Sequence, residues 1–192
     1  MKKGILAIAM VAATGTVASA QVIEVGPHDR TYTGFSRGFS YIAPVAHTIS
    51  NLEMPTESMV AGALASFMVE VDDVVMVYDI GNAGSLAVNI NVAAGSEVLV
   101  IGNWTDGAAG TFTAANSYAV GAAPYASSIL GNPVDLFRAG VQTDIADGSY
   151  VGGAGFTGLT GSRARIWVTV VPAPSALALL GLGGLVAVRR RR

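Results

Sequence analysis

The chain has 192 residues, of which 24 are glycine, 12% are charged and none is cysteine. This length fits one domain of ordinary size, and the lack of cysteine excludes disulfides, thiolate catalysis and zinc sites that need sulfur. Between Gln21 and Val171 five arginines stand against all 13 acidic residues, so this segment has a formal net charge of −8. Because binding to nucleic acid depends on neutralising phosphates with Lys and Arg, we expect no nucleic-acid partner.

Residues 1–20 have the pattern of a secretory signal peptide. Two lysines precede an apolar run over residues 4–17, and Ala18-Ser19-Ala20 supplies the small-x-small sequence that signal peptidase accepts. A short buried helix is the alternative, but the run lacks a polar face at helical spacing. We therefore expect cleavage after Ala20, so that the mature protein begins at Gln21, outside the inner membrane.

Residues 21–171 are predicted to form an all-β extracytoplasmic domain, an antiparallel β-sandwich or jelly roll. Apolar residues alternate with polar or small ones, as in a half-buried strand, and residues 86–92 are the clearest case. Turn residues separate the short strands, which favours a sandwich over a βαβ protein. Residues 56–66 could form one short helix, but we interpret them as a loop. Further strands are predicted over residues 67–71, 74–80, 97–101, 134–142 and 164–170. In the last of these, one face holds Ala164, Ile166, Val168 and Val170, and the other holds Arg163, Arg165, Trp167 and Thr169.

Two short motifs match catalytic or nucleotide-binding patterns. Residues 34–38 match G-x-S-x-G around Ser36, but that chemistry needs a strand-turn-helix elbow and a later histidine, and only His47 follows. Residues 153–158 match G-x-G-x-x-G, but a strand pattern follows where a dinucleotide site needs a helix. We interpret the first as a chance match in a Gly- and Ser-rich strand and the second as a glycine loop between strands.

Metal sites have weak support in the sequence. His28 and His47 are 19 residues apart with no repeating ligand spacing, so no transition-metal site is expected. Calcium stays open as the one candidate ion, because loop carboxylates suit a hard cation, although none of them forms an EF-hand pattern. Ordinary Asp-Gly turns are the competing interpretation. The candidate calcium ligands are Asp72, Asp73, Asp106, Asp144 and Asp147.

Two other groups of residues suggest carbohydrate chemistry. Glu70, Asp72, Asp73 and Asp79 are close enough in sequence for a pair of glycosidase carboxylates, but we favour a solvated acidic strand face, with Glu70 and Asp72 on one side and Asp73 opposite. Aromatic residues near loops could stack on sugar rings, with packing in the core or at its rim as the alternative. These aromatic residues are Trp104, Tyr118 and Tyr125, whereas Trp167 falls in a predicted strand.

Residues 172–192 have the layout of a membrane-directed tail. Val171-Pro172-Ala173-Pro174-Ser175 leads into 13 uncharged residues, 176–188, and then into the cluster Arg189, Arg190, Arg191 and Arg192. Thirteen helical residues span about 20 Å, less than the ~30 Å hydrocarbon core, so the span needs local thinning or snorkelling arginines. The positive-inside rule then places the arginines in the cytoplasm and the body outside.

This three-part tail resembles the PEP-CTERM sorting signal, although Ala173 stands where the family name has Glu. The resemblance implies recognition by a membrane-embedded exosortase, removal of the anchor, and release or attachment of the body at the cell surface, often in biofilm-forming bacteria. Residues 32–44 and 48–52 also resemble, loosely, the opening of β-rich bodies that precede such tails, for which the resemblance implies no activity.

We therefore expect a non-enzymatic surface or extracellular-matrix protein, secreted or held at the cell surface and associated with exopolysaccharide. Its expected partners are signal peptidase, an exosortase-type enzyme, extracellular polysaccharide and, transiently, the inner membrane. The alternative is a secreted carbohydrate-binding module with or without calcium, and a small secreted hydrolase is a more distant one.

Overall fold

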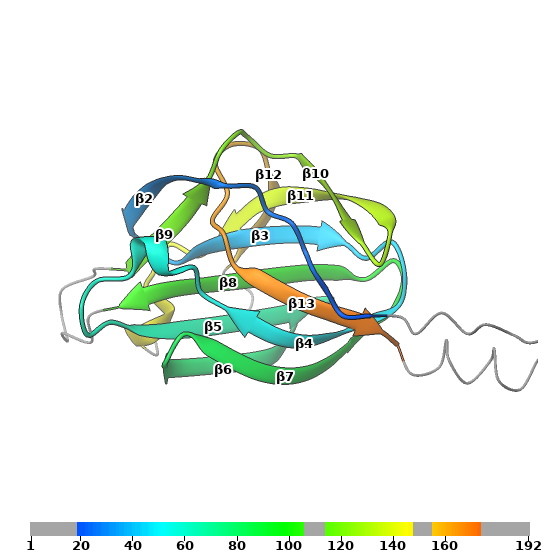
Figure 1. Cartoon of the computed structure of the whole chain (residues 1–192), viewed down its shortest axis with the longest axis horizontal. Coiled ribbons are helices and arrows are strands. Elements are labelled where there is room, and N and C mark those ends of the chain that lie inside the picture. Colours follow the sequence, from blue (N-terminus) through cyan, green and yellow to red (C-terminus); the bar gives the residue numbers. More distant parts are fainter. Residues whose placement is uncertain (1–18, 106–113, 148–154, 174–192) are drawn as a thin grey trace, which may run out of the picture.

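The structure is a computed structural model that describes residues 19–105, 114–147 and 155–173 (Figure 1). These residues form thirteen strands, all paired antiparallel, and two single-turn 3-10 helices, η1 (Thr56–Ser58) and η2 (Ile145–Asp147). No α-helix occurs in the described ranges. The predicted all-β antiparallel architecture is confirmed there, whereas most of the predicted signal peptide and the apolar span of the tail lie outside them.

The strands form two sheets. The four-stranded sheet has the order β1 (Gln21–Val22), β13 (Trp167–Pro172), β4 (His47–Glu53) and β7 (Ser85–Val92). The nine-stranded sheet has the order β10 (Tyr125–Ile129), β11 (Asn132–Gly140), β3 (Arg37–Ile42), β8 (Glu97–Thr105), β5 (Leu64–Val71) and β6 (Val74–Asn82). Off this path, β12 (Phe156–Leu159) pairs with β11, and β2 (His28–Gly34) pairs with β9 (Ala114–Ala119), which adjoins β8.

A single main core lies between the two sheets. Alternating residues of each sheet point into it, which is how two half-buried sheets remove their apolar faces from water. The larger sheet contributes Phe39, Tyr41, Phe67, Val69, Val98 and Val100, and the smaller sheet contributes Ile49, Leu52, Ile90, Val92, Val168 and Val170.

The larger sheet is also covered on part of its other face. Met68, Leu99 and Ile101 pack there against Val141 and Ile145, which belong to the segment that leads into η2. Strand β8 is therefore buried on both faces over most of its length. This explains why residues 97–101 read as a nearly continuous apolar run and not as an alternation.

The predicted strands agree with the structure in place, with small shifts at their ends. Strand β7 shows the predicted alternation, with Leu86, Val88, Ile90 and Val92 inward. Residues 56–66 lack an α-helix, as predicted, and hold the single turn η1, but residues 64–66 already belong to β5 and not to the predicted loop. The prediction for residues 164–170 was partly wrong, because β13 begins at Trp167 and both faces of the preceding segment are buried.

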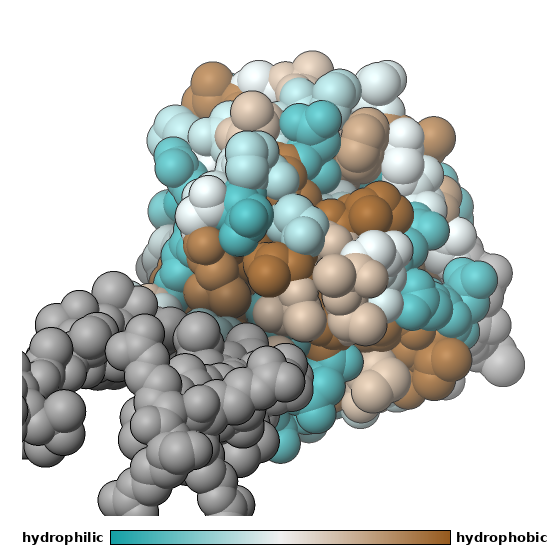
Figure 2. All heavy atoms as spheres, turned by 90° about the vertical axis from the view of Figure 1, so that its right-hand side faces the viewer, coloured by the Kyte–Doolittle hydropathy of each residue, from teal (hydrophilic) through white to brown (hydrophobic). Residues whose placement is uncertain are grey.

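The two ends of the body meet at one edge of the smaller sheet. In the antiparallel pair of β1 and β13, Gln21 lies opposite Val170. Ile23 extends the pairing by donating its backbone N–H to the Val168 carbonyl at 2.9 Å. At the end of the molecule where β13 finishes, apolar and polar side chains alternate over the surface (Figure 2).

Candidate functional site

Ser36 of the G-x-S-x-G motif is a buried structural residue. Its hydroxyl donates to Asn103 Oδ1 at 3.1 Å and accepts the Ile145 backbone N–H at 2.9 Å. Asn103 in turn donates to Asp144 Oδ1 at 2.8 Å. This network fastens the segment before η2 to the start of β3. The motif connects two strands and leads into no helix, so it lacks the elbow on which the nucleophile chemistry depends.

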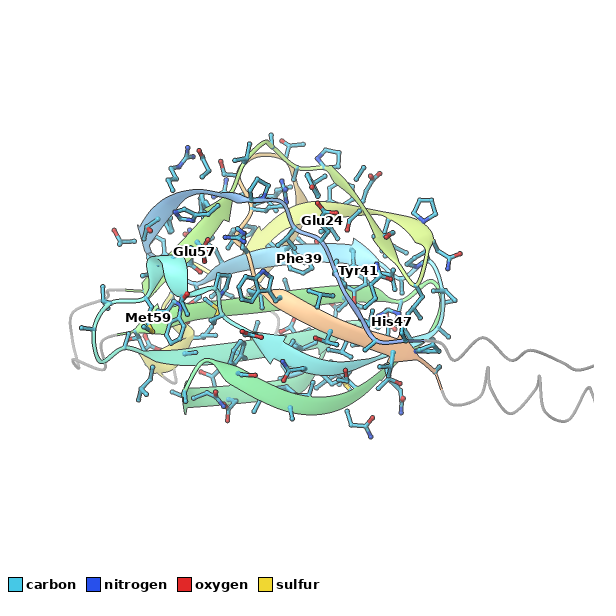
Figure 3. All side chains as sticks on the ribbon, in the orientation of Figure 1. Glu24, Phe39, Tyr41, His47, Glu57 and Met59 are labelled. Atoms are coloured by element: carbon cyan, nitrogen blue, oxygen red, sulfur yellow. The ribbon has the colours of Figure 1, made fainter. Side chains whose placement is uncertain are left out.

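His47 lies at the opposite end of β3 from Ser36. The six residues of β3 separate them, a length of about 20 Å at ~3.3 Å per residue. The buried imidazole bonds the Val45 carbonyl through Nδ1 at 2.9 Å and the Tyr41 hydroxyl through Nε2 at 3.1 Å (Figure 3). With Nδ1 donating to a carbonyl, Nε2 accepts from the tyrosine, which fixes a neutral tautomer.

Acid is expected to destabilise the protein through His47. Desolvation lowers the pKa of this imidazole, against a smaller raising effect of the Val45 carbonyl. The unfolded chain, with a histidine pKa of about 6.5, therefore binds the proton first as the pH falls. Stability should be constant above about pH 7.5 and decrease as the pH passes through 6.5 and below.

Urea unfolding at pH 7.5 and at pH 5.5 measures this decrease. The variant His47→Gln should lose most of it, and His28→Gln, which also removes one imidazole, is the matched control. An equal pH dependence in the His47→Gln protein would contradict the assignment. The range above pH 5 keeps the measurement clear of the carboxylates, which titrate lower.

The predicted acidic strand face was wrong. Asp72 and Asp73 form the two-residue turn between β5 and β6, with φ of 50° and 63°. Tight hairpin turns need such angles, and Asp tolerates them better than most residues. Asp72 also accepts the Glu97 backbone N–H at 2.9 Å, whereas Glu70 is buried within β5. Glu70 and Asp72 therefore do not share a solvated face.

The candidate calcium ligands are not brought together in the part of the chain that the structure describes. Among those residues no group of three or more His, Asp or Glu side chains could hold a metal ion. Asp144 Oδ1 accepts from Asn103 and from the Ala146 backbone N–H. Asp106 lies outside the described residues, and so do the first two positions of the G-x-G-x-x-G match. Of its remaining residues, 156–158 lie within the strand β12, where a loop between strands was predicted.

Two of the three aromatic residues predicted as sugar-stacking candidates are buried. Trp104 is 2% exposed and donates its indole N–H to the Pro55 carbonyl at 2.8 Å, and Tyr118 is 5% exposed. Tyr125 has its ring under the guanidinium of Arg163, 3.8 Å from the ring centroid. Trp167 is the tryptophan that remains partly exposed. The interpretation of Trp104 as an aromatic residue near a loop therefore overestimated its exposure.

Each of the five arginines of the body lies against an aromatic ring. Two of them, Arg37 and Arg138, approach the ring of Phe156 with guanidinium-to-centroid distances of 5.3 and 5.6 Å. Arg163 is fully buried and donates to the Val25 carbonyl at 2.7 Å, and burial lowers the pKa of its guanidinium. The other two contacts are those of Arg30 with Tyr118 and of Arg165 with Trp167. Arg163 and Arg165 join their segment to the residues after β1 through the carbonyls of Val25 and Gly26, a role that no sequence pattern indicated.

A groove of about 340 Å³ runs beside Trp167. Residues 22–26, which begin with the last residue of β1, form one side, and Arg165 and Trp167 form the other. The groove combines a partly exposed indole, a guanidinium and the carboxylate of Glu24. It could not be found from the sequence, because no spacing rule connects Glu24 with residues that come more than a hundred positions later.

The predicted cleavage and sorting residues are only partly described. Ala20 is exposed directly before β1, and Gln21 is fixed by its side chain, which donates to the Ser128 carbonyl at 3.0 Å. Val171 and Pro172 complete β13 opposite Thr48 and His47, and Ala173 is 7% exposed. The remaining predicted residues lie outside the described ranges: Ala18, Pro174, Ser175 and Arg189 to Arg192.

No protein-family model matches the chain, and the comparisons with curated proteins and with solved structures likewise found no match. Within the described residues, no helix is long and apolar enough to cross a membrane. The resemblance of the tail to a sorting signal therefore stays a prediction.

Proposed function

We propose that the chain is an exported, exosortase-processed surface or extracellular-matrix protein, whose β-sandwich body has no catalytic role and associates with exopolysaccharide. The observation that carries the proposal is the pairing of β1 with β13, which brings the two ends of the body together. A signal peptide before Gln21 and a sorting tail after Pro172 would then enter the same membrane from one end of the molecule. This geometry suits an exported precursor that is held at both ends.

The contacts of Ser36 and His47 support a non-enzymatic body. The serine hydroxyl is used by Asn103 and by the Ile145 backbone, and the imidazole by Tyr41 and Val45. A serine nucleophile needs its base within hydrogen-bond reach, and here a strand length separates the two.

Processing is expected to leave Val171, Pro172 and Ala173 on the mature protein. The first two residues are paired with β4, and the third is buried, so cutting there would require the end of β13 to leave the sheet. A protease needs an extended, accessible segment on both sides of the bond, which folded strands do not offer. We expect mass spectrometry of protein released by a host with an exosortase to find Gln21 first and a last residue at Pro174 or beyond, without the arginine cluster.

The matched control replaces Arg189 to Arg192 by alanine. This variant should keep its tail intact, because without the arginines the short span loses the positive-inside anchor that holds the tail at the membrane for processing, while the body is unchanged. Released protein that keeps the arginine cluster would contradict the sorting proposal. A mature chain that ends before Val171 would contradict the prediction that pairing with β4 protects the end of β13 from cleavage.

The second candidate function is that of a secreted carbohydrate-binding module, with or without calcium. The specific observation in its favour is the groove beside Trp167, which combines an aromatic ring with charged hydrogen-bonding groups. Both functions share the extracellular placement, and only the second requires a defined glycan-binding site on the purified body.

A further inference from the structure

We infer that the groove beside Trp167 binds a neutral sugar residue of a polysaccharide through the indole ring, Arg165 and Glu24. The inference deepens the second candidate function, and it rests on the extracellular placement proposed above, since polysaccharide is met there.

The guanidinium of Arg165 is held in one orientation by three contacts. Its Nε donates to the Gly26 carbonyl at 2.9 Å, and its Nη1 donates to Glu57 Oε1 at 2.8 Å and to Ser117 Oγ at 3.1 Å. The Nη2 group makes no hydrogen bond with any described residue. A fixed donor is thus left at the groove, with little rotamer entropy still to lose on binding.

Glu57 strengthens this arrangement from the far side of the guanidinium. Desolvation alone would raise the pKa of Glu57, but the hydrogen bond and the charge of Arg165 hold this pKa below its usual value. The carboxylate therefore stays ionised at neutral pH and remains bonded to Nη1. This leaves Nη2 as the nitrogen of Arg165 that no described residue uses, on a side chain that lines the groove.

Glu24 supplies an acceptor on the opposite side of the groove. Its backbone is fixed, because Ser127 donates to the Glu24 carbonyl at 2.7 Å, while its exposed side chain accepts a hydrogen bond from the Tyr125 hydroxyl at 3.4 Å through Oε1 and keeps Oε2 for a ligand (Figure 3). The Glu24 carboxylate forms no ion pair with Arg165, whose partner within the described residues is Glu57. Donor and acceptor are thus both available to one ligand.

These three groups match the chemistry of a pyranose ring. A sugar presents a face of C–H groups, which packs on an indole, and a rim of hydroxyls, each of which both donates and accepts hydrogen bonds. Arg165 can donate to one hydroxyl while Glu24 accepts from another. The groove volume of about 340 Å³ lies at the lower end of ligand sites, roughly 300–1,000 Å³, and suits one small ring.

The charges favour a neutral sugar over an acidic one. Among the described residues, Arg165 is the single cation that lines the groove and is already neutralised by Glu57, while Glu24 adds a carboxylate. The whole body between Gln21 and Val171 carries −8. A uronate or sulfate group would therefore meet net repulsion, whereas hydroxyl groups would not.

The test is retardation in native gels of the mature protein, purified from cells that express the full chain. Gels contain a neutral polysaccharide (dextran, laminarin or galactomannan) or an acidic one (alginate or polygalacturonate). We expect retardation by at least one neutral polymer and none by the acidic ones. Trp167→Ala should weaken the binding about tenfold, since stacking is lost, and Glu24→Gln about threefold.

Glu97→Gln is the matched control, because it removes an exposed carboxylate at the start of β8, away from the groove, and should bind as the original protein does. Because Trp167 packs partly on the core, acrylamide quenching of the unaltered protein gives a measurement that needs no variant. Trp104 is buried, so quenching reports on Trp167, and a bound polymer should reduce it.

Three results would each overturn the inference. They are retardation by acidic polymers alone, no retardation by any neutral polymer, and unchanged binding after Glu24→Gln together with unchanged quenching. None of these results bears on export or processing, which mass spectrometry of the mature ends tests separately.

Discussion

Replacing Gly38 by alanine is expected to reduce the free energy of unfolding by about 3 kcal/mol or more, a large part of the total stability of an ordinary domain. Gly38 lies in β3, paired with Ile101 of β8 on one side and with Ala139 of β11 on the other. A Cβ atom at this position would lie 1.8 Å from the carbonyl oxygen of Val100. Because the obstacle is backbone of a central strand, β3 and β8 would have to separate.

Gly62→Ala is the matched control for this prediction. Gly62 has a φ of +78°, but nothing lies within 4 Å of an added Cβ. It therefore carries the backbone strain of about 1–2 kcal/mol without a steric clash. Urea midpoints should rank the unaltered protein above Gly62→Ala and Gly62→Ala above Gly38→Ala. A Gly38→Ala protein as stable as the control would show that the two strands can move apart at little cost.

Truncating Trp104 to alanine is expected to cost about 3–5 kcal/mol, as for a large buried aromatic side chain. The ring fills the core beside Gly84, and a Cβ atom added at Gly84 would lie 2.7 Å from Trp104 Cη2. Because Gly84 has no side chain, nothing at that position can fill the cavity that the truncation leaves. Its indole N–H also satisfies the Pro55 carbonyl, which connects β8 to the segment before η1. Trp104→Phe keeps most of the volume and loses the hydrogen bond, for an expected cost of about 1–3 kcal/mol.

Chemical unfolding followed by circular dichroism measures both variants, since the loss of a tryptophan alters the fluorescence. Trp104→Phe should bind polysaccharide as well as the original protein does, because the ring is buried away from water. A large loss of binding without a loss of stability would return Trp104 to the role of a sugar-stacking residue that its loop position suggests.

The fold could be predicted from the sequence where burial follows a simple alternation. Strand β7 shows this most clearly, because one of its faces meets the core and the other meets solvent. The rule held for strand positions in general, since turn residues mark where the alternation stops. It failed for Asp72 and Asp73, where two carboxylates look like part of a strand face but form the turn itself.

The candidate groove could not be predicted, because its parts come from opposite ends of the body. Glu24 and Trp167 are brought together only by the pairing of β1 with β13, which no local pattern encodes. The burial of arginine side chains is a second feature that the sequence pattern predicts wrongly. A charged residue next to apolar ones suggests an exposed face, but Arg163 is buried because backbone carbonyls and the Tyr125 ring replace water around its guanidinium.

The placement of the arginines decides what a neighbouring molecule meets. Of the five, only Arg30 has a largely exposed side chain, at 60%, and it is paired with Asp29. Among the described residues, the exposed charged groups are therefore mainly carboxylates, and two copies repel each other over a Debye length of about 8 Å in physiological salt. Copies at high concentration should therefore keep further apart in dilute medium and approach more closely when salt or divalent cations are added.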